Sequence, residues 1–468
     1  MNWRKTGGLL LVMLVGMNVV GAANEKPNVV FFLVDDFGWG ALSSMGSDFH
    51  ETPNIDKLAK SGMAFSNGYA ACTVCSPSRA AILTGCYPGR IRLTDWIAGH
   101  KRPNAKLKVP DWNMKIDHER ILLPEALKEA GYATSFIGKW HLMPTRQKEL
   151  MKDHFPESHG FDQNIGGREW GQPKGRGLFF HPFDMPNVTS KEGDYLTDRL
   201  TDYAVEFIDQ QQNNPFFLYF SYYTVHWPIM GKPELVAKYK AKLKSGKYNQ
   251  NNPEYAAMVQ SLDESVGRVL DKLEERGLAD KTIVIFTGDN GATGSKYCGG
   301  LRGSKAYSHE GGVREPFFIK GPGIQPGTSD VPVIGTDFYP TILDLIATPL
   351  KPEQHKDGVS LKPLLLKTGD IEERSLFWHY PHYHKTNPYG AIRSGDYKLI
   401  EFFEDGKLEL YNLKDDLAEE SNLADKMPEK AAELLKELEQ WRIRVDAQLP
   451  TPNPKHNPEH GSHGFQIR

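Results

Sequence analysis

The sequence predicts an α/β protein that carries a smaller antiparallel sheet in its C-terminal part. Runs of β-branched and aromatic residues, such as 28–34 and 282–287, are typical of buried parallel strands. Segments with helical periodicity separate these runs. Near residue 372 the pattern changes to short alternating strands, which one amphipathic helix follows. We therefore expect a large α/β domain over residues 24–371 and a small subdomain over residues 372–449.

The elements are expected in the following order. In the large domain, strands are predicted at 28–34, 63–69, 132–137, 215–222 and 282–287, and helices at 52–59, 122–130, 195–212, 254–276 and 337–346. In the small subdomain, strands are predicted at 376–380, 390–393, 397–403 and 408–412, and a helix at 428–445. Residues 450–468 are rich in Pro, His and Gly, so we expect a flexible tail there.

Composition and charge limit the compartment and the partners. The chain has 468 residues and a formal net charge of −3, which gives no bulk attraction to nucleic acid. Arg4 and Lys5 precede a short apolar run, and small residues follow it at 21–23, so residues 1–23 are predicted to be a signal peptide. An uncleaved anchor is the alternative. We expect an exported protein, periplasmic or extracellular, without stable membrane insertion and without a nucleic-acid partner.

Polar residues follow several of the predicted strands directly. Asp35 and Asp36 come after the first strand, and Asp289 and Asn290 come after the strand at 282–287. Open α/β sheets place their ligands beyond the carboxyl ends of the strands, so one sheet edge would gather these groups. The set contains only oxygen ligands, which favours a hard cation such as Ca²⁺ or Mg²⁺ over Zn²⁺. Protonation of one aspartate is the competing way to relieve the repulsion.

Cys75 stands at a predicted helix start. It opens the run Cys75-Ser76-Pro77-Ser78-Arg79, and Thr84-Gly85 follows at the expected helix end. Ser76 is a favourable N-cap and Pro77 suits a first helical turn. Cys75 would then lie at the positive end of a helix dipole, where an anion is favoured. An ordinary cysteine is one alternative, and a redox or zinc pair with Cys72 is another, although no second CxxC accompanies it.

The run from Cys75 to Gly85 resembles the signature of the type I sulfatases, in which the first cysteine is oxidised to formylglycine after translation. The resemblance covers roughly residues 28–440. The segments at 138–141, 300–305 and 310–316 are similar to further family elements, and His226 matches a histidine at a strand end. The implied fold is alkaline-phosphatase-like, with a large, mixed, mostly parallel sheet between helices.

The resemblance also implies the site. It implies one Ca²⁺ ion, with Mg²⁺ as the alternative, and a maturation enzyme that generates the formylglycine. The implied metal ligands are Asp35, Asp36, Cys75 in its modified form, Asp289 and Asn290. The implied catalytic residues are Cys75, Arg79, Lys139, His141, His226 and Lys305. By resemblance, His141 assists the release of sulfate and His226 protonates the departing alcohol. With Cys75 modified, Cys72, Cys86 and Cys298 allow at most one disulfide.

The implied activity is hydrolysis of the sulfate ester of a sulfated carbohydrate. Overall the sequence is similar to the branch of arylsulfatase A and the N-acetylgalactosamine sulfatases, which suggests a galacto-configured sugar. The alternatives are a phosphodiesterase of the same superfamily and a non-catalytic protein that binds sulfated glycans. Residues that could line the sugar subsite are Trp96, His100, Tyr380, His382, His384 and Tyr389. The lysine-rich stretch 232–247 is either a basic lip for a polyanion or, as we favour, a solvated helical face.

Overall fold

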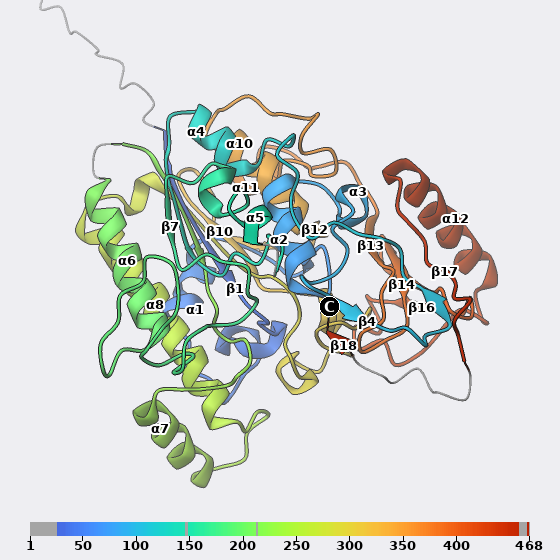
Figure 1. The fold of residues 1–468 in the computed structure, drawn as a ribbon, viewed down its shortest axis with the longest axis horizontal. Coiled ribbons are helices and arrows are strands. Elements are labelled where there is room, and N and C mark those ends of the chain that lie inside the picture. Colours follow the sequence, from blue (N-terminus) through green and yellow to red (C-terminus); the bar gives the residue numbers. More distant parts are fainter. Residues whose placement is uncertain (1–25, 146–147, 212–213, 458–465, 468) are drawn as a thin grey trace, which may run out of the picture.

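A central sheet of eight strands organises the large domain (Figure 1). The computed structural model describes residues 26–145, 148–211, 214–457 and 466–467, so the predicted signal peptide lies outside the described residues. The strand order is β11-β2-β10-β9-β1-β8-β6-β7. The strands are β1 (Asn28–Val34), β2 (Met63–Phe65), β6 (Ala133–Gly138), β7 (Gln163–Ile165), β8 (Phe216–Ser221), β9 (Thr282–Gly288), β10 (Phe317–Lys320) and β11 (Gly327–Ser329).

The sheet is mixed but mostly parallel, as predicted. β1 pairs in parallel with β8 on one side and β9 on the other, and β6 and β7 continue the parallel set. β10 runs antiparallel to both β9 and β2. Four parallel strands, β9, β1, β8 and β6, are therefore neighbours, and their carboxyl ends meet at one edge of the sheet.

Helices cover both faces of this sheet. The helices of the large domain are α1 (Pro53–Ser61), α2 (Cys75–Thr84), α3 (Pro88–Ile91), α4 (Leu123–Glu129), α5 (Lys148–Met151), α6 (Leu196–Gln210), α7 (Pro233–Lys244), α8 (Pro253–Glu275), α9 (Glu310–Val313), α10 (Phe338–Leu345) and α11 (Lys362–Leu366). Short strands lie outside the sheet at β3 (Gly68–Tyr69), β4 (His100–Lys101), β5 (Leu107–Lys108) and β12 (Val333–Ile334). In the described chain, no helix combines the length and the apolar character that a membrane span requires.

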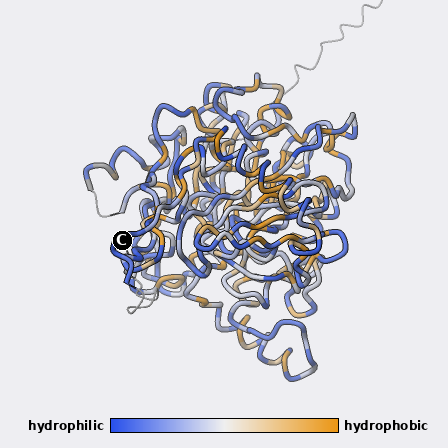
Figure 2. Tube along the Cα trace, turned by 90° about the vertical axis from the view of Figure 1, so that its right-hand side faces the viewer, coloured by the Kyte–Doolittle hydropathy of each residue, from blue (hydrophilic) through white to orange (hydrophobic). Residues whose placement is uncertain are grey.

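The alternation of side chains along β1 divides the interior into two cores. Val29, Phe31 and Leu33 pack with residues of α2, α4 and α10, whereas the side chains between them pack with α1, α6 and α8. Every residue of β1 is fully buried, apart from a small exposure at Asn28. A strand buried on both faces explains the continuous apolar run in the sequence. Figure 2 shows the hydrophobic residues concentrated in this interior and the hydrophilic ones on the surrounding loops.

The small subdomain is a four-stranded antiparallel meander covered by one helix, as predicted. It comprises β13 (Leu376–Tyr380), β14 (Tyr389–Ser394), β15 (Tyr397–Phe402), β16 (Leu408–Asn412) and α12 (Pro428–Val445). The following segment differs from the flexible tail expected at 450–468. β17 (Thr451–Pro452) pairs with β5, and β18 (Gln466–Ile467) pairs with β4. The C-terminal residues thus return to the large domain; residues 458–465 and 468 lie outside the described part.

A buried ionic network joins the two parts of the chain. The ammonium of Lys398 in β15 lies 2.8 Å from Glu310 in α9 and 3.1 Å from Glu419, and all three side chains are inaccessible to solvent. Arg314 adds a second cation, 2.7 Å from Glu310. Burial raises the pKa of Glu419 to about 7. At Glu310 burial acts in the same direction, but Lys398 and Arg314 outweigh it and lower the pKa.

Replacing Lys398 by methionine should destabilise the fold, because it leaves two buried carboxylates beside each other. We expect a loss of about 3–5 kcal/mol in the free energy of unfolding, measured by urea denaturation. Lys407→Met is the matched control, since Lys407 is 57% exposed where it pairs with Glu409, and we expect it to cost less than about 1 kcal/mol. Equal losses in the two variants would contradict the assigned role of Lys398.

Candidate active site

The ends of four neighbouring parallel strands deliver the polar residues of one site. Asp35 and Asp36 follow β1, Asp289 and Asn290 follow β9, Lys139 and His141 follow β6, and the loop after β8 carries His226. Because these strands are adjacent and parallel, their ends gather the residues, as the sequence predicts.

The acidic residues form a compact, fully buried cluster. The backbone N–H of Asp36 donates to Asp289 Oδ1 over 3.1 Å, and Asn290 Nδ2 donates to Asp36 Oδ1 over 2.8 Å. All four side chains, Asp35 included, have zero exposure. Asp36 adopts a positive φ of 53°, a conformation that costs a non-glycine residue on the order of 1 kcal/mol. The backbone of Asp36 is therefore locally strained at the position that directs its carboxylate into the cluster.

Each aspartate lies beside a cation, and Arg79 also lies 3.7 Å from Asp35, a pairing that the sequence did not predict. Lys139 Nζ lies 2.7 Å from Asp35, Lys305 Nζ lies 2.6 Å from Asp36, and Arg79 Nε donates to Asp289 over 2.8 Å. Lys139 comes from the segment directly after β6, Lys305 from the loop before α9, and Arg79 from α2. They reduce the repulsion among the carboxylates, and they surround the cluster with fixed positive charge.

Burial and these pairs shift the carboxyl pKa values in different directions. Burial raises the pKa of Asp35 to about 6, although Lys139 opposes the shift. Burial likewise raises the pKa of Asp289 against the effect of Arg79. At Asp36 burial is again the largest influence, but the combined effect of Lys305 and His226 outweighs it, so the pKa falls below its ordinary value.

The cluster fits a hard divalent cation. Among the described residues, the buried atoms Asp35 Oδ1 and Asn290 Oδ1 have no hydrogen-bond partner. Buried polar atoms without a partner are rare, and one common cause is an ion that occupies the space between them. The donors are carboxylate and amide oxygens, the ligands that Ca²⁺ prefers. His226 Nε2 lies 3.7 Å from Asp36 Oδ2, so one imidazole also borders this oxygen set.

Cys75 faces His141 at the first turn of α2. Its Sγ lies 3.3 Å from His141 Nδ1, and His141 Nε2 contacts the carbonyl of Ile97. Because a carbonyl only accepts, Nε2 carries the proton and Nδ1 presents its lone pair to residue 75. Burial, followed by the charge of Lys139, lowers the pKa of His141 well below its ordinary value. The imidazole is therefore neutral and oriented toward Cys75.

The start of α2 differs from the prediction by two residues. The helix begins at Cys75 with Val74 as N-cap, so Ser76 is not the cap. Instead, Ser76 Oγ accepts a hydrogen bond from the backbone N–H of Ile97 over 3.1 Å. Gly85 ends the helix as expected, with a φ of 63°. Cys75 thus lies inside the first turn, where backbone N–H groups remain free for an anion.

A cavity of about 530 Å³ opens onto these groups. Asp36, Cys75, His141, His226 and Lys305 line its floor. Its walls carry Trp96, Trp170, Trp227, Lys174, His384 and Lys385. The other predicted residues lie behind this floor: Asp289 and Asn290 bind Asp36, and Arg79 and Lys139 bind Asp289 and Asp35.

The structure places only some of the residues that were predicted for a sugar subsite at this cavity. Trp96 and His384 line the cavity, and the ring of His100 contacts both, with centroids 5.0 and 4.5 Å away. The other predicted residues are core residues. Tyr380 donates to Asp95, Tyr389 bonds to Thr73, and His382 bonds to Thr94, and all three are almost fully buried. Their aromatic and polar character serves packing between the domains.

Among the lining residues that sequence reasoning missed, four are aromatic or charged. Trp170, Lys174, Trp227 and Lys385 all come from loops without periodicity. Lys174 lies over the ring of Trp170, 3.7 Å from its centroid, and Trp227 is 61% exposed. The position of Trp227 directly after the predicted His226 was the one available signal.

The lysines of the 232–247 stretch do not line this cavity. Lys232 pairs with Asp198 and Glu264, and Lys238 and Lys242 pair with Glu51. This arrangement agrees with the favoured interpretation as a solvated helical face. All four cysteines, Cys72, Cys75, Cys86 and Cys298, are buried and free, so the one disulfide that the count allowed is not formed.

Comparisons with known proteins point to one family. A family model described as "Sulfatase" matches residues 27–348, and one described as "N-sulphoglucosamine sulphohydrolase, C-terminal" matches residues 303–446. A "Sulfatase" of Formosa agariphila is 32% identical, covering 94% of this chain and 93% of that protein. The N-acetylgalactosamine-6-sulfatase of Sus scrofa is 34% identical, covering 83% of this chain and 74% of that protein.

Solved structures extend the similarity to the fold. A crystal structure of Ps i-CgsB in complex with k-i-k-neocarrahexaose has a TM-score of 0.74 and 28% identity, covering 93% of this chain and 96% of that one. The large mixed sheet with its small antiparallel sheet is thus the alkaline-phosphatase-like fold that the sequence predicted. From the family match, the relatives and the fold together, the chain belongs to the type I sulfatase family.

Proposed function

We propose that this sulfatase hydrolyses a sulfate ester on a carbohydrate, with formylglycine derived from Cys75 as the nucleophile and one Ca²⁺ ion in the oxygen cluster. The observation that carries the proposal is the position of Cys75. It lies in the first turn of α2, beside a neutral histidine, and it opens with Asp36 and Lys305 into one aromatic-walled cavity. A maturation enzyme supplies the modification, and export to the periplasm or the cell exterior is part of the proposal.

The two absent groups would supply distinct chemistry. Hydrated formylglycine at position 75 would supply a hydroxyl as the nucleophile and, on the same carbon, a second hydroxyl whose deprotonation would assist release of sulfate. A Ca²⁺ ion held by Asp35, Asp36, Asp289 and Asn290 would act as a Lewis acid toward sulfate oxygens and lower the pKa of a hydroxyl bound to it.

The protein's own cations hold the anion and stabilise charge that develops on it. Lys305 reaches the cavity, while Lys139 and Arg79 stand behind the aspartates. These charges are fixed by ion pairs before the substrate arrives, so little reorganisation accompanies the reaction. The N–H groups of the first turn of α2 add to the same positive potential.

The two histidines suit opposite proton transfers. His141 Nδ1 presents a lone pair to residue 75 from 3.3 Å, so it can accept a proton from a hydroxyl at that position. His226 also lines the cavity floor, 3.7 Å from Asp36, and we assign it to the leaving alcohol. Burial lowers the pKa of His226 to about 3, and Asp36 opposes that shift. A bound sulfate ester adds negative charge beside this imidazole and favours its protonated, acidic form.

Several observations support a sugar as the alcohol. Three tryptophans line the cavity, and aromatic faces pack well against the apolar faces of sugar rings. One relative is an N-acetylgalactosamine-6-sulfatase, and a structural relative was solved with an oligosaccharide, k-i-k-neocarrahexaose. We therefore propose a galacto-configured, sulfated sugar as the substrate.

Release of inorganic sulfate from a panel of sulfated sugars tests the activity. The panel should include galactose and glucose derivatives sulfated at different positions, together with p-nitrophenyl sulfate. Matched phosphate mono- and diesters serve as controls, because a phosphodiesterase of the same superfamily would prefer them. Sulfate release from galacto-configured sugars is the expected result. Turnover of phosphate diesters alone would overturn the assignment.

Replacing His226 by alanine should impair substrates with poor leaving groups most. We expect a loss of roughly 10²-fold in kcat for a sugar sulfate and a smaller loss for p-nitrophenyl sulfate, whose phenolate leaves without a proton. Parallel measurement of kcat on both substrates checks this. Equal losses on the two would show that His226 is not the acid for the leaving alcohol.

A further inference from the structure

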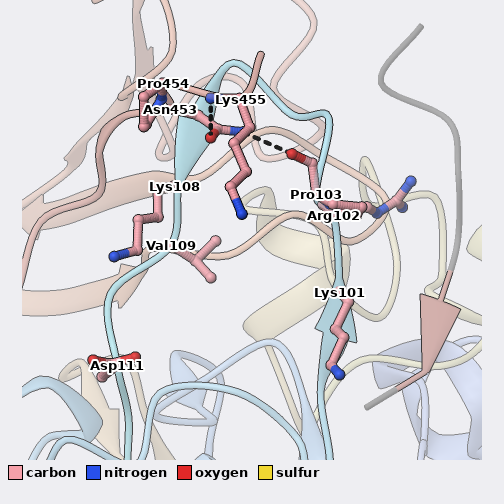
Figure 3. A pocket seen from close by; sticks show the side chains of 9 residues that line it. All are labelled: Lys101, Arg102, Pro103, Lys108, Val109, Asp111, Asn453, Pro454 and Lys455. Carbon is pink, nitrogen blue, oxygen red and sulfur yellow. Dashed lines mark hydrogen bonds between the residues drawn. The ribbon is translucent and has the colours of Figure 1, made fainter. Parts of the chain in front are cut away.

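A second cavity, of about 460 Å³, lies next to the active-site cavity and is strongly basic (Figure 3). Lys101, Arg102, Lys108 and Lys455 line it, with Asp111 as its one acid. Figure 3 shows Lys108 and Lys101 on the two sides of the space, with the side chain of Lys455 extending between them. Four cations against one carboxylate give this cavity a net charge of about +3 when all five groups are ionised.

Three of these cations have no acidic partner within the described chain. Lys101, Lys108 and Lys455 form no ion pair there, unlike Lys232, Lys238 and Lys242 on α7, which pair with nearby acids. Like charges that gather without counter-charges repel one another and attract an anion. A volume of this size lies within the range of sites for small ligands.

The cavity rests on a defined frame. Lys101 belongs to β4 and Lys108 to β5, and β5 pairs with β17 from the C-terminal segment. Asn453 fastens this segment, because its Nδ2 donates to the carbonyls of Pro103 and Ala105 over 2.9 and 2.7 Å. Lys455 is thereby held opposite the other lysines.

The basic cavity and the active-site cavity share a wall. Arg102 lines the basic cavity and donates through NH2 to the carbonyl of His384 over 3.3 Å. His384 lines the active-site cavity. The ring of His100, which precedes Lys101, lies 4.5 Å from the ring of His384. A chain bound at the active site therefore needs to pass only this thin partition to reach the lysines.

We propose that the basic cavity binds a second anionic group, a sulfate or carboxylate, on the same saccharide chain whose sulfate ester occupies the active site. The inference rests on the proposed function and deepens it, since it makes the substrate an oligosaccharide or polymer with several charges. The lysines supply affinity for the long chain and take no part in the chemistry at Cys75.

A charge-neutralising triple variant tests this cavity. We compare Lys101→Gln/Lys108→Gln/Lys455→Gln with a matched control, Lys240→Gln/Lys244→Gln/Lys247→Gln, which removes the same charge from exposed lysines on and just after α7. The substrates are a sulfated galactan disaccharide and an octasaccharide. We expect KM for the octasaccharide to rise about ten-fold in the cavity variant. Its kcat and its KM for the disaccharide should stay within about two-fold of the wild-type values.

Other outcomes would overturn the proposal. An unchanged octasaccharide KM in the cavity variant would contradict it. An equal rise of KM in the control variant would also contradict it, because it would indicate a general electrostatic attraction and not binding in the cavity. Because the cavity variant lacks three of the charges, added salt should weaken its binding of the octasaccharide less than it weakens binding by the wild-type protein.

A binding measurement keeps this test separate from that of the activity. In a Cys75→Ala background, calorimetry with the sulfated octasaccharide, with its desulfated counterpart and with inorganic sulfate measures affinity without turnover. We expect the cavity variant to weaken binding of the sulfated octasaccharide alone. If the wild-type enzyme released no sulfate from any sugar, the proposed function would be wrong. The calorimetry would still show whether the basic cavity binds the sulfated octasaccharide. If the Cys75→Ala protein bound the sulfated octasaccharide equally well with and without the three lysine substitutions, the proposed role of the cavity would be refuted.

Discussion

Replacing Cys75 by alanine is expected to abolish sulfate release, with a loss of about 10⁴-fold or more in kcat. The variant removes the side chain that would become the nucleophile, and no other nucleophile in the cavity floor can take its place beside His141. Cys72→Ala is the matched control, because Cys72 is also buried and free and lies three residues away. It should retain activity, whereas a redox or metal pair of Cys72 and Cys75 would make the two variants equally inactive.

Mass spectrometry checks the chemistry behind this result. Trypsin should release residues 61–79 as one peptide that contains both cysteines. Conversion of Cys75 to formylglycine lowers the mass of that peptide by about 18 Da, and alkylation should then label Cys72 only. Activity in a sample whose peptide carries two alkylated cysteines would contradict the proposed nucleophile.

Removal of divalent cations is expected to lower kcat/KM by about 10³-fold, and Ca²⁺ should restore it. The reason is the pair of buried oxygens, Asp35 Oδ1 and Asn290 Oδ1, that accept no hydrogen bond from the described residues, although Arg79 lies 3.7 Å from Asp35 Oδ1. Binding of Ca²⁺ to the folded state should also raise the melting temperature of the chelator-treated protein by a few degrees. Activity assays and thermal melts across a Ca²⁺ titration measure both effects.

A pair of asparagine variants distinguishes a loss of Ca²⁺ binding from a general loss of stability. Asn290→Ala removes one oxygen ligand without a change in charge, so we expect Ca²⁺ affinity to fall about 10- to 100-fold. Asn164→Ala removes another buried amide, one that bonds only to the backbone of Gly167, and it should leave the Ca²⁺ dependence intact. If chelation changed neither activity nor stability, the three paired cations would suffice to neutralise the aspartates and the metal proposal would be wrong.

The strands and the site were largely predictable because local patterns determine them. The apolar run of β1 and the amphipathic pattern of α12 specify their own bounds, and the predicted ranges agree with the structure. The residues that follow the parallel strands must meet at one edge, so the clustering of Asp35, Asp289 and His141 followed from topology.

The remaining features depend on contacts between distant segments, which the sequence does not reveal. The pairing of Lys305 with Asp36 joins positions far apart in the chain. Tyr380 and Tyr389 have the composition of a sugar site, but packing between the domains buries them. The attachment of the C-terminal segment beside β5 depends on the hydrogen bond that Asn453 donates to the carbonyl of Ala105. No periodicity in the sequence predicts such a contact.

The depth at which Cys75 lies has a consequence for the biogenesis of the enzyme. Only 2% of this residue is reachable by solvent, and its backbone is already committed to a helix. A modifying enzyme would need wider access to this thiol than the folded chain provides. Under the proposed function, we therefore expect conversion of Cys75 to the aldehyde before the nascent polypeptide folds, and molecules that fold first should remain inert.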